Sequence, residues 1–417
     1  MPQPHFRRFF ARLGPGLITG AADDDPSGIS TYSVAGASFG YAPLWTALFS
    51  FPLMVAIQLM CARLGMVTGL GLAGVIRRRY SRWVLWSACA LLGVANTINI
   101  AADLGGMAAA TELVTRIRAA FWLLVYAVAL TSALVWTSYR AIARIFKWLT
   151  LVLGAYVLTA FFTRVDWHAA LGATLLPHLE WTRGFFALLV GLFGTTISPY
   201  LFFWQAAQEV EEERAMGRSL QQREGATQEE LRDARTDVVT GMFASNAVMY
   251  FIILTTAATL HTAGRTDITT AREAAEALRP LAGGAAYWLF TAGIIGTGML
   301  AVPVLAGSCA YAVAEAAAWR HLSLSSRPGA AKGFYGVMVV AMCLGLALGY
   351  AGFNAIRLLF ITAVINGVLA PPLVLLVVLL TSSRDVMGEA VNTPAITWLG
   401  WATFAIMTAS ALGLLLS

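Results

Sequence analysis

Long apolar stretches recur along the whole chain, each with the length and composition of a membrane-spanning helix. A helix needs about 20 mostly apolar residues to cross the hydrocarbon core of a bilayer. Because lipid cannot hydrogen-bond an open backbone, the pattern predicts an all-α polytopic membrane protein. We expect eleven transmembrane helices, at residues 14–36, 43–66, 84–112, 120–138, 145–163, 184–207, 238–260, 285–318, 334–350, 355–381 and 394–416.

Two of these stretches are interrupted by a polar residue that precedes proline. The first reads Asp-Pro-Ser-Gly at 25–28 and the second Thr-Thr-Ile-Ser-Pro at 195–199. Proline removes a backbone donor and drives the residue before it out of helical geometry. Two broken helices at corresponding positions are the best sequence indication of the substrate site of a secondary transporter.

The breaks also predict an internal repeat. They fall in the first and the sixth span, so each copy holds five spans, and an odd number requires the second copy to be inverted in the membrane. We expect one transporter domain over residues 1–417. Its parts are a first repeat at 1–163, a second at 184–381, an additional helix at 394–416 and a cytoplasmic loop at 208–236 that contains a short surface helix.

Composition and charge agree with a multi-pass protein of the cell (inner) membrane. Hydrophobic residues make up 58% of the chain and charged residues 12%, against about 25% charged in soluble domains. Of the 28 Lys and Arg residues, 20 fall in segments on the side of the N-terminus, which predicts a cytoplasmic N-terminus and an external C-terminus. This bias accounts for the net charge of +6, so no nucleic-acid partner is needed. No obligate protein partner is evident either.

The residues at the breaks suggest a site for a hard cation. An ionised carboxylate inside a span costs about 2.5–3.5 kcal/mol and is seldom incidental. We expect Asp25 to be the central ligand, with a backbone carbonyl freed near Gly28 and hydroxyl or carbonyl oxygens of Thr195 and Ser198 beside it. In the alternative interpretation, Asp25 caps a half-helix and the hydroxyls bond their own backbone.

Other intramembrane polar residues are candidates for lining a path. Asn96, Asn99 and Asp103 share one stripe of a helix, and such a stripe faces the protein interior or water. Hydrogen bonding between helices explains the two asparagines equally well. Asp24, within the acidic run at the first break, and Asn366, in the tenth span, are further candidates.

Several motifs together resemble the NRAMP family of divalent-metal transporters. The resemblance is strongest from about residue 12 to 210, and it implies a LeuT-like fold that works by alternating access, with the metal as substrate rather than cofactor. The motifs are Gly-Pro-Gly at 14–16, Asp-Pro-Ser-Gly at 25–28, Ala-Arg-Leu-Gly-Met-Val-Thr-Gly at 62–69, Arg-Arg-Arg-Tyr at 77–80, Tyr-Arg at 139–140 and Phe-Lys-Trp-Leu-Thr-Leu-Val-Leu at 146–153.

The substrate prediction rests on positions where this chain differs from the family's sequence pattern. The family places asparagine, alanine, methionine, histidine, histidine and glutamate where this chain has Gly28, Thr195, Ser198, Tyr200, Gln205 and Gly106. These changes make the chain similar to the NRAMP-related magnesium transporters. Loss of the thioether removes a preference for softer transition metals, and loss of the titratable groups removes the family's proton route. The resemblance therefore implies import of Mg²⁺, and also of Mn²⁺, without proton coupling, and it adds Tyr200 and Gln205 to the path-lining candidates.

Two other functions stay open at this point. One is a proton-coupled Mn²⁺ or Fe²⁺ symporter. The other is a sodium-coupled carrier of small organic solutes on the same fold, although a carboxylate at the break disfavours anionic substrates. The chain has no catalytic constellation, so we do not expect an enzyme.

Overall fold

The structure, a computed structural model, describes residues 14–417 except 137–150, 219–224, 320–322, 325 and 327. All of the regular secondary structure in these residues is helical, as the apolar pattern predicted. The first half of the chain forms α2 (Pro15–Asp23), α3 (Pro26–Phe39), η1 (Ala42–Leu44), α4 (Trp45–Thr68), α5 (Leu72–Arg79), α6 (Arg82–Thr115), α7 (Ala119–Trp136), η2 (Leu151–Leu153), α9 (Gly154–Phe162) and α10 (Trp167–Leu175).

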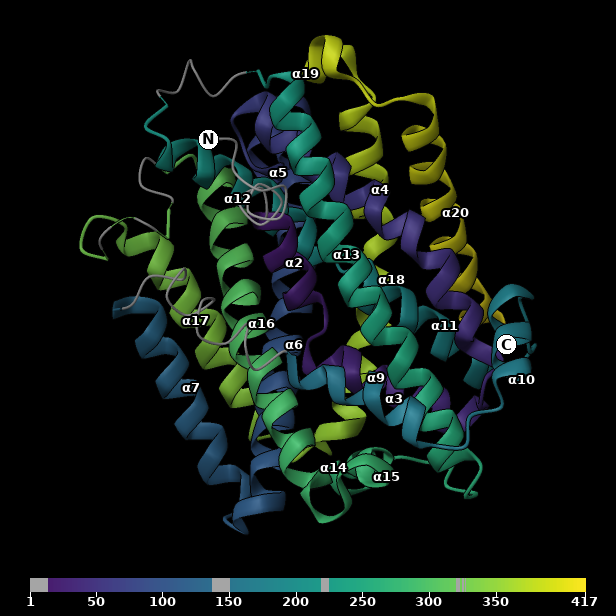
Figure 1. The fold of residues 1–417 in the computed structure, drawn as a ribbon. Helices are drawn as coiled ribbons and strands as arrows, with labels where there is room; N and C mark the ends of the chain where they lie inside the picture. The colour runs from purple at the N-terminus through teal and green to yellow at the C-terminus, as the bar shows by residue number, and fades with distance from the viewer. Residues whose placement is uncertain (1–13, 137–150, 219–224, 320–322, 325, 327) are drawn as a thin grey trace, which may run out of the picture.

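The second half continues the helical bundle, and its last helix, α20, packs against α18, α11 and α4 (Figure 1). It forms α11 (Arg183–Thr196), α12 (Pro199–Ala215), α13 (Gln228–Thr256), η4 (Ala257–His261), α14 (Ala271–Ala275), η5 (Glu276–Leu278), α15 (Arg279–Ala282), η6 (Gly283–Ala285), α16 (Ala286–Ala316), α17 (Lys332–Gly349), α18 (Ala355–Thr381), α19 (Arg384–Met387), η7 (Gly388–Ala390) and α20 (Pro394–Leu416).

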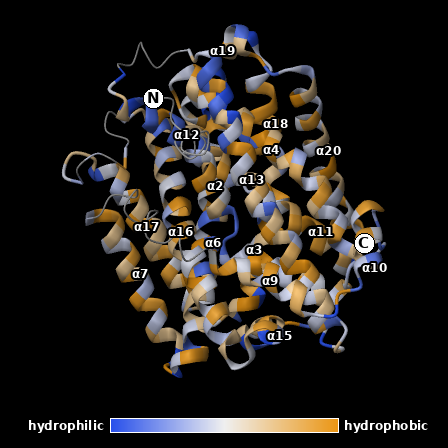
Figure 2. Ribbon diagram, in the orientation of Figure 1, coloured by the Kyte–Doolittle hydropathy of each residue, from blue (hydrophilic) through white to orange (hydrophobic). Residues whose placement is uncertain are grey.

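Within the described residues, nine helical segments are long and apolar enough to cross a membrane. The expected first span is present as the two half-helices α2 and α3. The expected fifth span, 145–163, appears as η2 and α9, and its first residues lie outside the described part. Figure 2 shows orange helices around the bundle, with blue at the link between α2 and α3. The prediction of an all-α polytopic membrane protein is confirmed.

Both predicted breaks are real interruptions of the helix. α2 ends at Asp23 and α3 begins at Pro26, while α11 ends at Thr196 and α12 begins at Pro199. In each case proline is the first helical residue, where its missing N–H costs nothing. The links are therefore only two residues long.

The segment expected to form a loop at 208–236 is largely helical. α12 continues to Ala215, and α13 begins at Gln228 and enters the membrane without interruption. Thr227 and Glu230 form a capping box that fixes this start, and no proline follows to end the helix. The expected surface helix is thus the first turns of α13.

Glycines bring the half-helices into close contact with their neighbours. A Cβ at Gly20 in α2 would lie 2.3 Å from the carbonyl oxygen of Gly241 in α13. A Cβ at Gly194 in α11 would lie 2.1 Å from the carbonyl oxygen of Ala363 in α18. Small residues at such crossings let helix backbones pack closely in membranes. The two breaks are therefore held on a rigid frame of α13 and α18.

Candidate functional site

The carboxylate of Asp25 uses one oxygen to cap α3 and keeps the other nearly open. Oδ1 accepts hydrogen bonds from the Ser27 hydroxyl at 2.6 Å and the Gly28 amide at 2.7 Å. Oδ2 is contacted by the Tyr200 hydroxyl at 3.4 Å. Asp25 is 2% exposed, so its charge lies inside the bundle. The capping interpretation is correct for Oδ1, and Oδ2 is left as a candidate ligand.

Gly28 packs closely beside this carboxylate. A Cβ at this position would meet the Asp23 carbonyl oxygen and the Tyr32 ring at 3.4 Å, which is ordinary contact distance. A side chain larger than alanine would have to displace the Tyr32 ring or the link. Gly28 therefore permits this close packing next to Asp25, and its amide serves the cap rather than a ligand.

At the second break the hydroxyls bond their own helix. The Ser198 hydroxyl lies 2.7 Å from the carbonyl oxygen of Thr195 and 2.8 Å from that of Gly194, and the Thr195 hydroxyl donates to the carbonyl oxygen of Leu192 at 3.0 Å. This matches the alternative interpretation of these hydroxyls. Their lone pairs are not consumed by donating, so both oxygens can still accept or ligate.

Tyr200 joins the two breaks. Its hydroxyl donates to the carbonyl oxygen of Ala22 at 3.0 Å and also lies near Asp25. Ala22 is in the last turn of α2, where carbonyls lack helical partners. The tyrosine that stands in place of a family histidine thus ties α12 to the end of α2, beside the candidate ligand.

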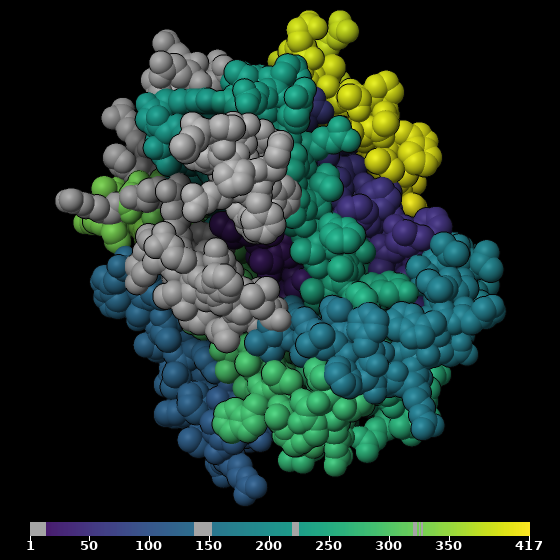
Figure 3. Space-filling model, in the orientation of Figure 1, coloured from purple at the N-terminus to yellow at the C-terminus, as the bar shows by residue number. Residues whose placement is uncertain are grey.

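Asp23 and Asp24 turn toward α13 instead of toward Asp25. The Ser245 hydroxyl lies 2.6 Å from Asp23 Oδ2 and 3.2 Å from Asp24 Oδ1. Both aspartates are buried, and one hydroxyl proton serves only one of them at a time. Figure 3 shows purple atoms of the N-terminal part of the chain in a recess beside the teal atoms of α13. The path-lining position of Asp24 stays a prediction.

The polar stripe on α6 contacts two other spans. Asn96 donates to the Leu305 carbonyl oxygen at 2.9 Å and to Ser308 Oγ at 2.8 Å, both in α16. Asn99 donates to Asn366 Oδ1 in α18 at 2.9 Å. The asparagines therefore do bond between helices, as one of the two interpretations held.

These bonds leave the other polar atoms of the stripe without partners. Among the described residues, no hydrogen bond reaches Asn96 Oδ1, Asn99 Oδ1, Asn366 Nδ2 or either oxygen of Asp103. The Asp103 carboxylate faces the start of α3 near Ser27 and interacts electrostatically with Asp25. Leaving a buried polar group unpaired costs about 1–3 kcal/mol, so this face is suited to water or a hydrated ligand.

Gln205 lies on a separate polar line between α2 and α12. The Thr19 hydroxyl donates to Gln205 Oε1 at 2.6 Å, and Gln205 Nε2 donates to Glu209 Oε1 at 2.8 Å. Gln205 is fully buried. It therefore holds the two half-helices together one and a half turns beyond Tyr200, rather than facing Asp25.

Tyr32 is a site residue that the sequence did not reveal. Its ring covers Gly28, and its buried hydroxyl faces Thr195 and the three aspartates without a hydrogen-bond partner in the described part of the chain. In a sequence, an aromatic residue inside an apolar helix is interpreted as a residue of the hydrophobic core. The only signal was its position one turn after Gly28, on the same face.

The donor set consists of oxygen atoms. No three His, Cys, Asp or Glu side chains among the described residues are grouped so that they could hold a metal ion. One carboxylate oxygen, two hydroxyls and nearby carbonyls remain as possible direct ligands. Such a set suits Mg²⁺, Ca²⁺ or Mn²⁺ that keeps part of its water shell.

Comparison with known proteins places this arrangement in a family. The profile described as natural resistance-associated macrophage protein-like, Nramp, matches residues 16–417. A relative named divalent metal cation transporter MntH, from Deinococcus radiodurans, is 28% identical over 420 residues, which cover 97% of this chain and 89% of the relative. The protein of the same name from Aeromonas hydrophila is 25% identical, over an alignment that covers 92% of this chain and 89% of that relative.

Solved structures share the fold. The manganese transporter of Eremococcus coleocola, in complex with an aromatic bis-isothiourea compound, superposes with a TM-score of 0.77 at 19% identity, over 99% of this chain and 88% of that one. MhsT in complex with L-phenylalanine gives a TM-score of 0.58 at 14% identity, over 96% and 97% of the two chains. The LeuT-like fold is therefore shown by structure as well as by sequence.

Proposed function

This chain belongs to the Nramp family, and on that premise we propose that it is a secondary transporter that imports divalent cations, Mg²⁺ above all and also Mn²⁺, without moving protons. The observation that carries this proposal is the donor set at the two breaks. Asp25 Oδ2 is the nearly open carboxylate oxygen at the first break, and Thr195 and Ser198 at the second break offer only oxygen. A site without sulfur or imidazole lacks the ligands that select softer ions over Mg²⁺.

Hydration of the cargo is supported by the open acceptors around the site. Mg²⁺ dehydrates reluctantly and keeps several waters. The waters of a hydrated cation point their hydrogens outward and need acceptors. Both oxygens of Asp103, which interacts electrostatically with Asp25, are buried acceptors without hydrogen bonds in the described structure, and Asn96 Oδ1 and Asn99 Oδ1 are further such acceptors along the same stripe of α6.

Absence of proton coupling is supported by the packing around Gly106. A Cβ there would lie 2.9 Å from Leu359 Cδ1, so a leucine of α18 covers the position where the family has a glutamate. Gln205, in place of a histidine, is not titratable and is engaged by Thr19 and Glu209. Asp103 and the buried run from Asp23 to Asp25 remain as carboxylates. Intramembrane proton relays use chains of titratable groups, and Gly106 and Gln205 cannot continue such a chain.

Mg²⁺ uptake by proteoliposomes tests the proposed function. Asp25→Ala is expected to reduce uptake of Mg²⁺ and Mn²⁺ to the level of empty vesicles. Asp166→Ala is the matched control, because Asp166 also caps a helix, by accepting from the Ala169 amide at 3.0 Å, but lies exposed at the start of α10. Uptake that survives in Asp25→Ala, or no Mg²⁺ uptake by the unmodified protein, would contradict the proposal.

A proton-coupled Mn²⁺ symporter is the second candidate. The relatives named MntH and the buried Asp103 carboxylate favour it. The alternative of a sodium-coupled carrier of small organic solutes rests on the shared fold alone, and no residue of the site favours it.

A further inference from the structure

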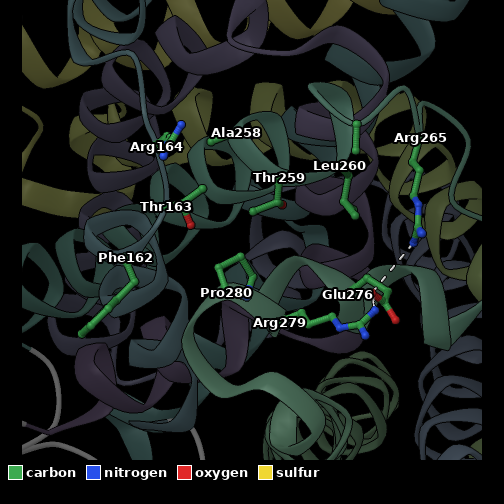
Figure 4. Close-up of a pocket in the computed structure, with 11 residues that line it drawn as sticks. Phe162, Thr163, Arg164, Ala258, Thr259, Leu260, Arg265, Glu276, Arg279 and Pro280 are labelled. Carbon is green, nitrogen blue, oxygen red and sulfur yellow. Dashed lines mark hydrogen bonds and ion pairs between the residues drawn. The ribbon is translucent and has the colours of Figure 1, made fainter.

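We propose that a cavity at the α15 end of the bundle binds the phosphate group of an anionic phospholipid. The cavity has a volume of about 530 Å³ and lies between the end of α9, the π-helical η4 and the start of α15. Figure 4 shows Arg265 and Arg279 reaching toward Glu276, with Arg164 on the other side of the cavity. This binding does not depend on which cation the protein carries.

The cavity has an excess of positive charge. Arg164, Arg265 and Arg279 line it together with one carboxylate, that of Glu276. Glu276 Oε2 lies 3.0 Å from Arg279 Nη1 and 3.9 Å from Arg265 Nη1. Glu276 therefore offsets one of the three positive charges, and Arg164 forms no ion pair within the described structure. Two positive charges remain for an anion.

This concentration of charge stands out at its end of the molecule. Only eight of the 28 basic residues fall in segments on the side opposite the N-terminus. Three of the eight line this cavity, and a fourth, Arg272, stacks over the ring of Tyr287 at 5.3 Å. Tyr287 in turn donates to Glu276 Oε1 at 2.5 Å. Positive charge is thus scarce on this side and is gathered at one place.

Apolar surroundings favour a lipid over a free anion. Ala258, Leu260 and Pro280 line the cavity beside the arginines. Phe161 and Phe162, at the end of α9, are each 68% exposed, as expected of side chains that face lipid. Arginine side chains near the ends of membrane helices extend to the headgroup level, while exposed phenylalanines beside them face the acyl chains. A phospholipid would place its phosphate on the arginines and its acyl chains along these rings.

The cavity is built on an element that supports α3. η4 packs against α3, and His261 Nδ1 lies 2.8 Å from the Ala37 carbonyl oxygen. The Ser38 hydroxyl donates to the Thr266 carbonyl oxygen at 2.7 Å, in the segment that follows η4. A lipid bound between α9 and η4 would therefore stabilise α3, the half-helix that Asp25 caps.

Native mass spectrometry of the full-length protein with phosphatidylglycerol tests this proposal. Arg164→Gln/Arg279→Gln is expected to weaken lipid retention about fivefold for each arginine removed, the usual contribution of one basic side chain to binding an anionic membrane. The control is Arg118→Gln/Arg357→Gln, which changes the same charge in exposed positions on the same side but outside the cavity. Glu276→Gln, which removes the competing carboxylate, should raise retention.

Three results would overturn the proposal. The first is an equal loss of lipid in the two double variants, which would mean general attraction to charge. The second is displacement of phosphatidylglycerol by excess inorganic phosphate, which would mean a site for a free anion. The third is retention of phosphatidylcholine equal to that of phosphatidylglycerol. None of these measurements involves transport, so failure here and failure of the proposed function can be told apart.

Discussion

At the scale of single residues, the geometry of Asp25 is compatible with both roles that the sequence presented as alternatives, the cap that the structure shows and the ligand that we propose. Oδ1 caps α3 through Ser27 and Gly28, and Oδ2 faces the space beside Tyr200. Capping therefore orients the carboxylate rather than competing with a ligand role. The cap also explains why the acid stands directly before Pro26, because proline accepts the first helical position and leaves the cap residue extended.

Asp25→Asn separates the two roles. Asparagine caps helices about as well as aspartate, so the free energy of unfolding should change by only a few tenths of a kcal/mol, while Asp25→Ala should cost about 0.5–2 kcal/mol. Both variants lack the negative charge and should fail to transport Mg²⁺. Thermal unfolding and uptake are measured on the same preparations. Full transport by Asp25→Asn would mean that the charge is dispensable and that Asp25 is only a cap.

Ser198→Met tests whether the second break selects the ion. A thioether prefers softer ions, so the variant should take up Mn²⁺ and Cd²⁺ in preference to Mg²⁺. The readout is competition among the three ions for uptake into proteoliposomes, in variant and parent. If the order of competition is the same in both, residue 198 does not contact the cargo.

At the scale of helices, the breaks were predictable and their packing was not. Proline acts on its own backbone and on the residue before it, so Pro26 and Pro199 mark the links from sequence alone. Which polar groups meet depends on how distant helices pack. The pairing of Asn99 with Asn366, and the turn of Asp23 toward Ser245, had no local signal.

Close helix crossings give a prediction for the frame around the site. Gly194→Ala puts a methyl group 2.1 Å from the Ala363 carbonyl oxygen, so α11 and α18 must separate, and we expect a lower melting temperature and impaired transport. Gly93→Ala in α6 is the control, because no atom lies within 4 Å of its Cβ position. There alanine should leave stability unchanged or raise it by about 0.5–1 kcal/mol. Equal melting temperatures for the two variants would show that the close crossing of α11 and α18 does not stabilise the second break.

At the scale of the whole molecule, the charge pattern and the inverted repeat agree with the carrier that we propose, whose site lies between the two breaks. The 20 to 8 division of basic residues supports a cytoplasmic N-terminus and an external C-terminus. In that orientation the cell's membrane potential drives cations inward. A divalent ion that crosses 100 mV gains about 4.6 kcal/mol, so transport down this gradient needs no proton.

The central claim, uncoupled import of a hard divalent cation, is tested most directly by one measurement. Vesicles that contain the protein and a pH-sensitive dye receive Mg²⁺ or Mn²⁺ outside, while a potassium gradient sets the voltage. We predict that uptake rises with inside-negative voltage, changes little with an imposed pH gradient and leaves the interior pH constant. Acidification of the interior in step with Mn²⁺ uptake would contradict this account and establish the proton-coupled symporter.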